Sequence, residues 1–251
     1  MSGHNKWSSI KHKKAATDAK RGKIFTRYIR EITVAARAGG DDPDANPRLR
    51  SAITAAKGVN MPKDNIERAI SRGAGGEEGV NIDEIRYEGY GQGGVAIIVD
   101  CMTDNRNRTV SDVRSAFTKG GGNMGESGCV SWMFHQKGHF FFDRNETDEE
   151  SIMEVAMDAG AEDIQDNPDA GYIEVTSEPA DFTAIHDAFE AADLKSQHSE
   201  VSWIPENSIV IEGDAAEKLL ALIERLEELD DVQNVYANHD ISDKELARIE
   251  G

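Results

Sequence analysis

Lysine and arginine side chains crowd the first 37 residues of the chain, where ten of them stand against two acidic residues. Ammonium and guanidinium groups at this density neutralise phosphates, and a neighbouring aromatic ring can stack on an exposed base. The pattern indicates contact with nucleic acid, although a solvated, helix-forming charged segment would carry the same cluster. The residues that would provide these contacts are Lys6, Trp7, Lys11, His12, Lys13, Lys14, Lys20, Arg21, Lys23, Arg27 and Arg30.

The charge of the chain is divided unevenly. Residues 1–75 contain sixteen basic and seven acidic residues, a net charge of +9, whereas the whole chain has a net charge of −19. The remaining residues therefore sum to −28, and such an acidic body would repel nucleic acid and orient the basic part toward it. We expect the basic surface to extend over Lys57, Lys63, Arg68 and Arg72.

Helices must position these basic residues. Apolar residues between 24 and 36 recur at three- and four-residue intervals, which predicts an amphipathic helix. The pair Asn46-Pro47 provides a cap and a first-turn proline for a second helix, and a third is expected over residues 62–73. The sequence thus predicts an all-α helical domain over residues 1–75, followed by a glycine-rich linker at 73–83.

Beyond the linker, short β-rich runs alternate with helical patterns, which predicts an α+β fold. The β-α-β units in tandem suggest ferredoxin-like layers. We predict one α/β domain formed by residues 84–134 and 206–240, with a second, formed by residues 135–205, inserted in it. Strands are expected at 85–90, 95–102, 130–134, 139–143, 172–176, 200–204, 208–211 and 232–236, and helices at 110–117, 147–159, 179–189 and 214–229.

Two loops of the acidic body are candidates for further contacts. The first contains Asn105, Arg106, Asn107 and Arg108 between a strand and a helix, where exposed N–H groups attract anions. A capped turn with solvated arginines explains the same residues. The second is the glycine-rich segment 120–128, which is either a flexible loop that reaches into a partner or a connector between helix and strand. Its candidate contacts are Asn123, Met124 and Gly125.

The sequence gives little indication of nucleotide binding, metal binding or catalysis. Residues 89–94 match GxGxxG, but a strand follows where a dinucleotide site needs a helix, so we expect a hairpin turn. The segment 120–128 lacks the GK[ST] ending of a P-loop. The histidines are scattered, and His135 and His139 are a weak metal pair. We predict no catalytic residue, metal site or cofactor, and a protein that is not an enzyme.

The expected location is the cytoplasm. No apolar run approaches the roughly 18 residues that a membrane span needs, and the polar, basic start lacks the apolar segment of a secretory signal. Cys101 and Cys129 lie in apolar runs without CxxC spacing, which is typical of buried, reduced thiols. We expect nucleic acid as the partner, and no membrane.

Several long segments resemble the YebC/PmpR family. They are GHNKWSSIKHKKAATDAKRGKIFTRYIREITVAAR, NPRLRSAITAAKGVNMPKDNIERAISRGAG, YEGYGQGGVAIIVDCMTDNRNRTVSDVRSAFTKGGGNMGESGCVSWMF and VSWIPEN, and together they extend over essentially the whole chain. The resemblance implies a cytoplasmic protein with an α-helical N-terminal domain and two α/β domains. It also implies nucleic-acid contact through the basic residues of the N-terminal segment and through the two loops.

The resemblance leaves two functions open. Members of the family are described as probable DNA-binding transcriptional regulators, whereas relatives that include mitochondrial translational activators resemble ribosome-associated factors. The second group implies a translation factor that binds ribosomal RNA and relieves stalling at sequences such as proline runs. We expect a non-enzymatic, nucleic-acid-binding regulator of gene expression. A protein of another class, an effector-binding or enzymatic α+β protein, is the remaining alternative.

Overall fold

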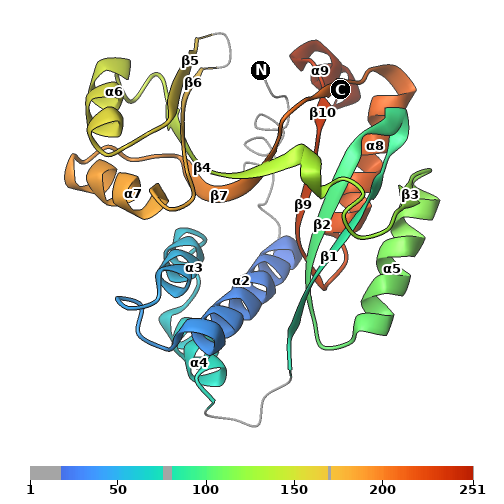
Figure 1. The fold of residues 1–251 in the computed structure, drawn as a ribbon, viewed down its shortest axis with the longest axis horizontal. Coiled ribbons are helices and arrows are strands. Elements are labelled where there is room, and N and C mark those ends of the chain that lie inside the picture. Colours follow the sequence, from blue (N-terminus) through green and yellow to red (C-terminus); the bar gives the residue numbers. More distant parts are fainter. Residues whose placement is uncertain (1–17, 76–80, 169–170, 251) are drawn as a thin grey trace. The chain divides into compact units, whose positions relative to one another are not determined.

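Figure 1 shows the computed structural model of the chain, which describes residues 18–75, 81–168 and 171–250. The chain divides into two compact units: residues 132–207 form one, and the residues before and after this insert form the other. The predicted α+β fold with a helical N-terminal region is confirmed. The division into three domains with the boundaries given above stays a prediction. Among the described helices, none has the length and apolar character needed to cross a bilayer.

The described part of the N-terminal region contains three helices: α2 (Asp18–Gly39), α3 (Pro47–Gly58) and α4 (Lys63–Gly73). The side chain of Asn46 caps α3 by accepting the Leu49 N–H at 3.1 Å. The predicted apolar stripes meet in one core, which includes Ile32, Leu49, Ala52, Ile53, Ala56, Ile66 and Ala69. The predicted helices are therefore present, and apolar burial between them holds the basic surface in place.

Gly73 ends α4 where that helix packs closely on α2. A Cβ atom at this position would lie 2.4 Å from the carbonyl oxygen of Thr33 and 2.7 Å from the Cβ of Ala36. Such distances are below van der Waals contact, so a larger residue would force the two helices apart. The glycine that the sequence suggests as a helix stop is thus also required by the contact between the helices.

The first sheet has the strand order β3-β1-β2-β9. The long strands β1 (Asp83–Tyr90) and β2 (Ala96–Thr103) pair along their whole length as an antiparallel hairpin. The connection between them is a short 3-10 turn over Gln92–Gly94, so the glycine-rich motif is a hairpin turn, as predicted. The outer strands are β9 (Val232–Ala237) and β3 (Asn123–Met124).

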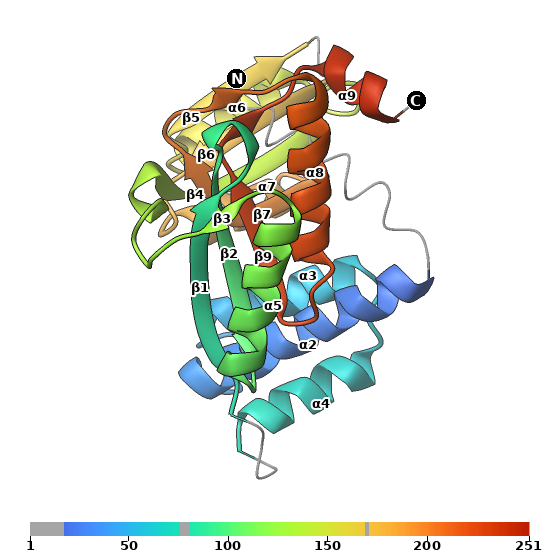
Figure 2. The same cartoon turned by 90° about the vertical axis from the view of Figure 1, so that its right-hand side faces the viewer.

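Two helices, α5 (Arg106–Lys119) and α8 (Gly213–Glu227), lie side by side on one face of this sheet (Figure 2). They enclose a core that includes Ile97, Val99, Val113, Phe117, Leu219, Leu222 and Leu226. The short parallel strands β8 (Ile209–Val210) and β10 (His239–Asp240) and the helix α9 (Asp243–Glu250) complete the unit.

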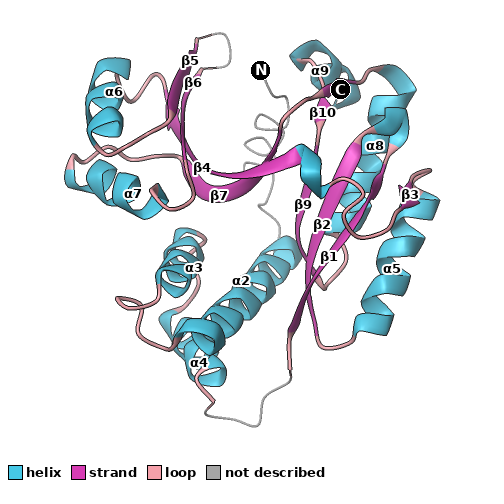
Figure 3. Ribbon diagram, viewed as in Figure 1, coloured by secondary structure: helices cyan, strands magenta, loops and turns pink. Residues whose placement is uncertain are grey.

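The insert has the β-α-β-β-α-β order of a ferredoxin-like layer. Its elements are β4 (Phe134–Asp143), α6 (Glu149–Asp158), β5 (Asp163–Asn167), β6 (Tyr172–Ser177), α7 (Phe182–Ala191) and β7 (His198–Pro205). The sheet order is β5-β6-β4-β7, and both helices cover one face of it (Figure 3). Phe140 and Phe142 of β4 pack against that helical layer, where Phe140 stacks on Phe182 with ring centroids 4.8 Å apart.

The structure differs from the sequence prediction in several elements. The strand expected at 130–134 is wrong in its first part, because Ser131–Met133 form a 3-10 turn and β4 begins at Phe134. The helix expected from residue 179 begins at Phe182. Strand β5 was not expected, because Asp163–Asn167 is a polar sequence whose single aliphatic residue gives little β pattern. Helix α9 and the two-residue strand β3 were also missed.

His135 and His139 each lie near a carboxylate, and Cys101 and Cys129 are not in a disulfide. His135 is exposed with Nε2 3.9 Å from a Glu206 carboxylate oxygen, whereas His139 is buried with Nδ1 2.8 Å from Glu174. The two histidines therefore have separate acidic partners and do not form a pair. Both cysteines are free thiols, as expected; Cys129 is only half-buried, and burial raises the pKa of Cys101 to about 12.

Candidate nucleic-acid interface

Three predicted phosphate-binding residues of α2 contact the C-terminal end of α8 or the residues that follow it. Lys23, Arg27 and Arg30 recur at four- and three-residue intervals, which places them on one face of the helix. The side chain of Lys23 donates to the carbonyl oxygen of Glu228, and Arg27 donates to that of Glu227 at 2.5 Å. The last carbonyl groups of a helix lack intrahelical partners and carry partial negative charge, so cations bind there.

These cations are partly withdrawn from water. Burial lowers the pKa of Arg27, and burial together with the charge of Arg27 lowers the pKa of Lys23. A phosphate group would have to replace the carbonyl oxygens to reach them. In this structure the basic face of α2 therefore fastens the helical region to α8.

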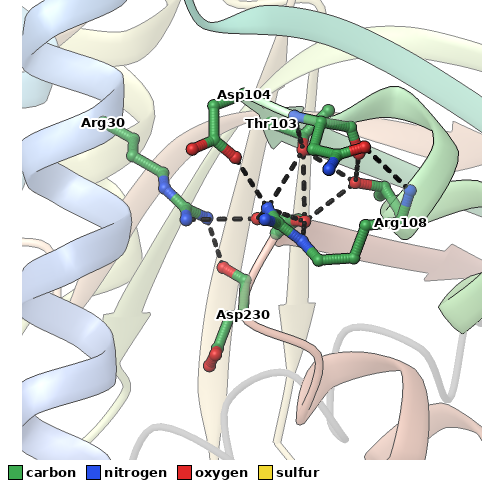
Figure 4. Close-up of polar contacts among 8 residues, drawn as sticks. Arg30, Thr103, Asp104, Arg108 and Asp230 are labelled. Carbon is green, nitrogen blue, oxygen red and sulfur yellow. Dashed lines mark hydrogen bonds and ion pairs between the residues drawn. The ribbon is translucent and has the colours of Figure 1, made fainter. Parts of the chain in front are cut away.

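Asp231 continues this contact beyond α8. Its carboxylate accepts hydrogen bonds from Arg108 and Thr109, both at 2.8 Å. Thr103 donates to the same group at 3.2 Å, and the guanidinium group of Arg30 lies 3.1 Å from its other oxygen. The side chain of Asp231 is only 6% exposed, and Arg30 also donates to the carbonyl oxygen of Asp230. Figure 4 shows Arg30 and Arg108 extending toward each other from opposite sides.

Local structure explains how the loop residues reach this carboxylate. Asn105 caps α5 by accepting the Arg108 N–H at 3.1 Å, as its position before the helix suggests. The first turn of α5 then presents Arg108 and Thr109 to Asp231. Burial by itself would raise the pKa of Asp231, but the hydrogen bonds from Arg108 and Thr109 outweigh burial and hold the pKa below its usual value.

Arg106, Asn107 and Arg108 do not form an open anion-binding site. Arg106 forms an ion pair with Asp83 at 2.8 Å, and Arg108 forms a second one with Asp104 at 2.7 Å. Asn107 is exposed in the first turn of α5. Both arginines that the sequence predicts as anion ligands are thus already paired with carboxylates of the chain itself.

The glycine-rich segment is attached to the first sheet. Asn123 and Met124 pair with β1, and the N–H of Gly125 donates to the carbonyl oxygen of Glu88 at 2.8 Å. Met124 is half-buried against the core of the unit. Of the two alternatives that the sequence leaves open, the geometry favours the connector between helix and strand.

A buried carboxylate holds the end of this segment. The side chain of Glu88, 3% exposed, accepts backbone N–H groups from Gly128, Val130 and Ser131, each at 2.8 Å. Burial would raise the pKa of Glu88, but these backbone hydrogen bonds outweigh it and keep the pKa below its usual value. The backbone at 130–131 is therefore satisfied by a side chain, which explains why the expected strand is absent there.

Arg48 of α3 forms ion pairs with Glu31 and Glu84, each at 2.7 Å, whereas the candidate cations of α3 and α4 remain open to solvent. Lys57 and Arg72 are exposed, and within the described residues their side chains have no hydrogen bond or ion pair. Lys63 lies 3.4 Å from exposed Glu67, a surface pair of little energetic weight. Arg68 donates only to residues of its own helix, at 2.8 and 3.0 Å.

The other candidates lie wholly or partly outside the described residues. Lys6, Trp7, Lys11, His12, Lys13 and Lys14 precede the first described residue, and Lys20 and Arg21 belong to α2 without described side chains. Sequence reasoning also missed two residues that organise the site, Glu88 and Asp231. Asp231 stands in the acidic run EELDD and Glu88 in a strand with other charged residues, so neither had a signal that separates it from a solvated surface carboxylate.

Comparison with known proteins identifies a matching family and a similar solved structure. Residues 5–76 match the TACO1/YebC protein N-terminal domain, and residues 82–239 match the TACO1/YebC second and third domain. A crystal structure of a conserved hypothetical protein from Aquifex aeolicus is similar in fold, with a TM-score of 0.82 and 46% sequence identity, over 92% of this chain and 94% of that chain.

Curated relatives match over nearly their whole length. A protein from Geotalea uraniireducens is 59% identical over 249 residues, which are 99% of this chain and 100% of the relative. A protein from Nitrosomonas eutropha is 59% identical over 236 residues, 94% of this chain and 97% of the relative. Both are named as probable transcriptional regulatory proteins. Because the family's domains match both segments, residues 5–76 and 82–239, the chain belongs to the TACO1/YebC family.

Proposed function

We propose that this protein is a nucleic-acid-binding regulator of gene expression whose helical region contacts phosphate groups. In this proposal, α3, α4 and the basic residues before α2 meet the nucleic acid, while the acidic surface of the rest of the chain is repelled by it. The protein acts in the cytoplasm and catalyses no reaction. The regulatory names of its relatives agree with this role.

One contrast in the structure carries the proposal. Four arginines of the acidic body and Arg48 of α3 each contact a carboxylate at 2.6–2.8 Å, whereas Lys57 and Arg72 are exposed and have no such partner among the described residues. Unpaired surface cations repel one another, and release of counterions on phosphate binding favours their use as nucleic-acid ligands. The four paired arginines are Arg86, Arg106, Arg108 and Arg144.

The binding mode follows from the kinds of side chain available. The exposed cations lie on two of the described helices, α3 and α4. On α4, Asn65 shares a face with Arg68 and Arg72, but its side-chain oxygen accepts from Arg68 at 2.8 Å, which occupies polar groups that could read base edges. We therefore expect a grip on the phosphate backbone with little base readout. In the form of this proposal in which the protein regulates transcription, the partner is duplex DNA.

Structured ribosomal RNA is the second candidate partner. The spread of cations over α3 and α4 favours recognition by shape, which is how proteins bind double-stranded RNA. The protein would then be a ribosome-associated translation factor that relieves stalling at difficult sequences such as proline runs. The basic region serves both roles, so the partner has to be distinguished by experiment.

Sedimentation of a cell lysate through a sucrose gradient separates the two partners. A DNA-bound regulator migrates with DNA and returns to the top of the gradient after DNase treatment. A ribosome-bound factor migrates with ribosomal particles after DNase treatment and leaves them when Lys11, Lys13 and Lys14 are replaced by Glu. Protein that stays at the top at low salt, with and without nuclease, contradicts both forms of the proposal.

A further inference from the structure

A second group of cations lies on the acidic body, on the helices α5 and α8, which lie side by side (Figure 2). A hollow of about 340 Å³ opens there, lined by Lys119 at the end of α5 and by Lys218 and Arg225 of α8. Lys218 and Arg225 are seven residues apart, so they lie on the same face of α8. Gln92, Gly120 and Gly121 line the hollow with them.

The three cations have no partner within the described part of the chain. All three side chains are exposed, and no acidic residue lines the hollow. Glu217, the acidic neighbour of Lys218 in the sequence, forms an ion pair with Arg248 at 2.8 Å. This arrangement differs from the paired arginines elsewhere in the body.

Close packing and a hydrogen bond hold the backbone of Gly120 and Gly121, next to Lys119, in one position. Gly121 has a φ of +72°, and a Cβ atom at Gly120 would lie 2.7 Å from Leu222. The side chain of Gln92 donates to the carbonyl oxygen of Gly121 at 3.0 Å. The glycines therefore bring the end of α5 close to α8, which places Lys119 opposite the cations of that helix.

The helix dipoles do not account for the cluster. Lys119 and Arg225 stand in the last turns of their helices, where a cation is favourable without any ligand. Lys218, however, lies in the first half of α8 and gains nothing from that effect. The carbonyl groups at the end of α5 are also occupied, since those of Ala116, Phe117 and Thr118 accept N–H groups of the three following glycines.

We propose that Lys119, Lys218 and Arg225 form a phosphate site that binds the backbone of the same nucleic acid as the helical region. The inference rests on the proposed function and adds a second contact to it. A phosphate group offers several acceptor oxygens to cations that line the same hollow, and it relieves their mutual repulsion. This site gives an otherwise acidic body one place at which it attracts nucleic acid.

The experiment compares three forms of the full chain: the wild type, a site variant with Lys119→Gln, Lys218→Gln and Arg225→Gln, and a control with Arg114→Gln, Lys195→Gln and Lys244→Gln. The control loses the same charge at exposed positions that do not line the hollow. One arm measures the thermal shift with inorganic tripolyphosphate. The other measures fluorescence anisotropy with a labelled DNA duplex and a labelled RNA hairpin over a range of salt concentrations.

We expect tripolyphosphate to raise the melting temperature of the wild type and the control, but not of the site variant. We also expect the site variant to bind the nucleic-acid probe about tenfold more weakly than the control, with a salt slope smaller by about 1–2. Equal affinity and slope in the site variant and the control overturn the nucleic-acid contact, even if tripolyphosphate binds. If no form binds DNA or RNA, the proposed function fails; the tripolyphosphate arm then reports separately whether the hollow binds free phosphate.

Discussion

Replacement of Asp231 by alanine is expected to lower the free energy of unfolding by about 2–3 kcal/mol. The substitution removes a buried acceptor that Arg30, Arg108, Thr103 and Thr109 share. Removal of one partner of a fully buried ion pair costs about 3–5 kcal/mol. The effect is smaller here because the Arg108 side chain is 46% exposed and water can solvate it.

Denaturation by urea measures this effect, with Asp230→Ala as the control. Asp230 is exposed and contributes its backbone carbonyl to the contact with Arg30, so loss of its side chain should change stability by less than about 0.5 kcal/mol. An Asp231→Ala protein as stable as this control would show that the carboxylate does not hold the unit together.

Acid should weaken the same contact. The pKa of Asp231 is lower in the folded protein than its usual value, so its contribution to stability is present above the unfolded pKa, about 3.9, and is lost as the pH falls through the folded pKa. The stability difference between wild type and Asp231→Ala should therefore be constant near pH 7 and shrink below about pH 4.

Glu88→Gln is expected to have an effect of similar size, about 2–3 kcal/mol. Three backbone N–H groups converge on the Glu88 carboxylate, and hydrogen bonds to a charged acceptor contribute about 1.5–3 kcal/mol each in favourable cases. Glutamine keeps the shape of the side chain but loses the charge. It also turns an N–H group toward at least one of the backbone donors, which leaves that donor without an acceptor.

Amide hydrogen exchange and urea denaturation together test this prediction. The amides of Gly128, Val130 and Ser131 should exchange faster in Glu88→Gln, while those in α3 and α4 keep their wild-type rates. Glu126→Gln is the matched control, because Glu126 is exposed in the same segment. Unchanged exchange at these three amides would contradict the assigned role of Glu88. The pKa of Glu88 is also lowered, so its contribution persists above about pH 4.3 and fades at lower pH.

These two carboxylates mark the limit of what the sequence predicts. Apolar periodicity and the Asn46 cap specified α2, α3 and α4, because those signals lie within a few residues of one another. The partners of Asp231 come from positions 30, 103, 108 and 109, which only the folded chain brings together. Charge in the sequence likewise shows where cations are, and does not show which of them the fold pairs with carboxylates.

The basic residues illustrate this difference. Lys23, Arg27, Lys57 and Arg72 are all cations on predicted helices, and the sequence does not distinguish them. In the structure, Lys23 and Arg27 contact the end of α8, whereas Lys57 and Arg72 are exposed. Contact between α2 and α8 depends on where α8 ends, and helix ends are difficult to place from sequence. The candidate interface therefore narrows to α3 and α4 among the described residues.

The most direct test of the nucleic-acid role is the salt dependence of binding by purified protein. The interface variant has Lys57→Glu, Lys63→Glu and Arg72→Glu, and the control has Arg114→Glu, Lys195→Glu and Lys244→Glu, with the same change in net charge. We predict that the interface variant binds the labelled DNA duplex or RNA hairpin at least about 100-fold more weakly than the control. Its salt slope should be smaller by about 2–3, because each lost phosphate contact removes about 0.7–0.9 from the slope. Equal affinities and slopes for folded interface variant and control would contradict the assignment of nucleic-acid binding to α3 and α4.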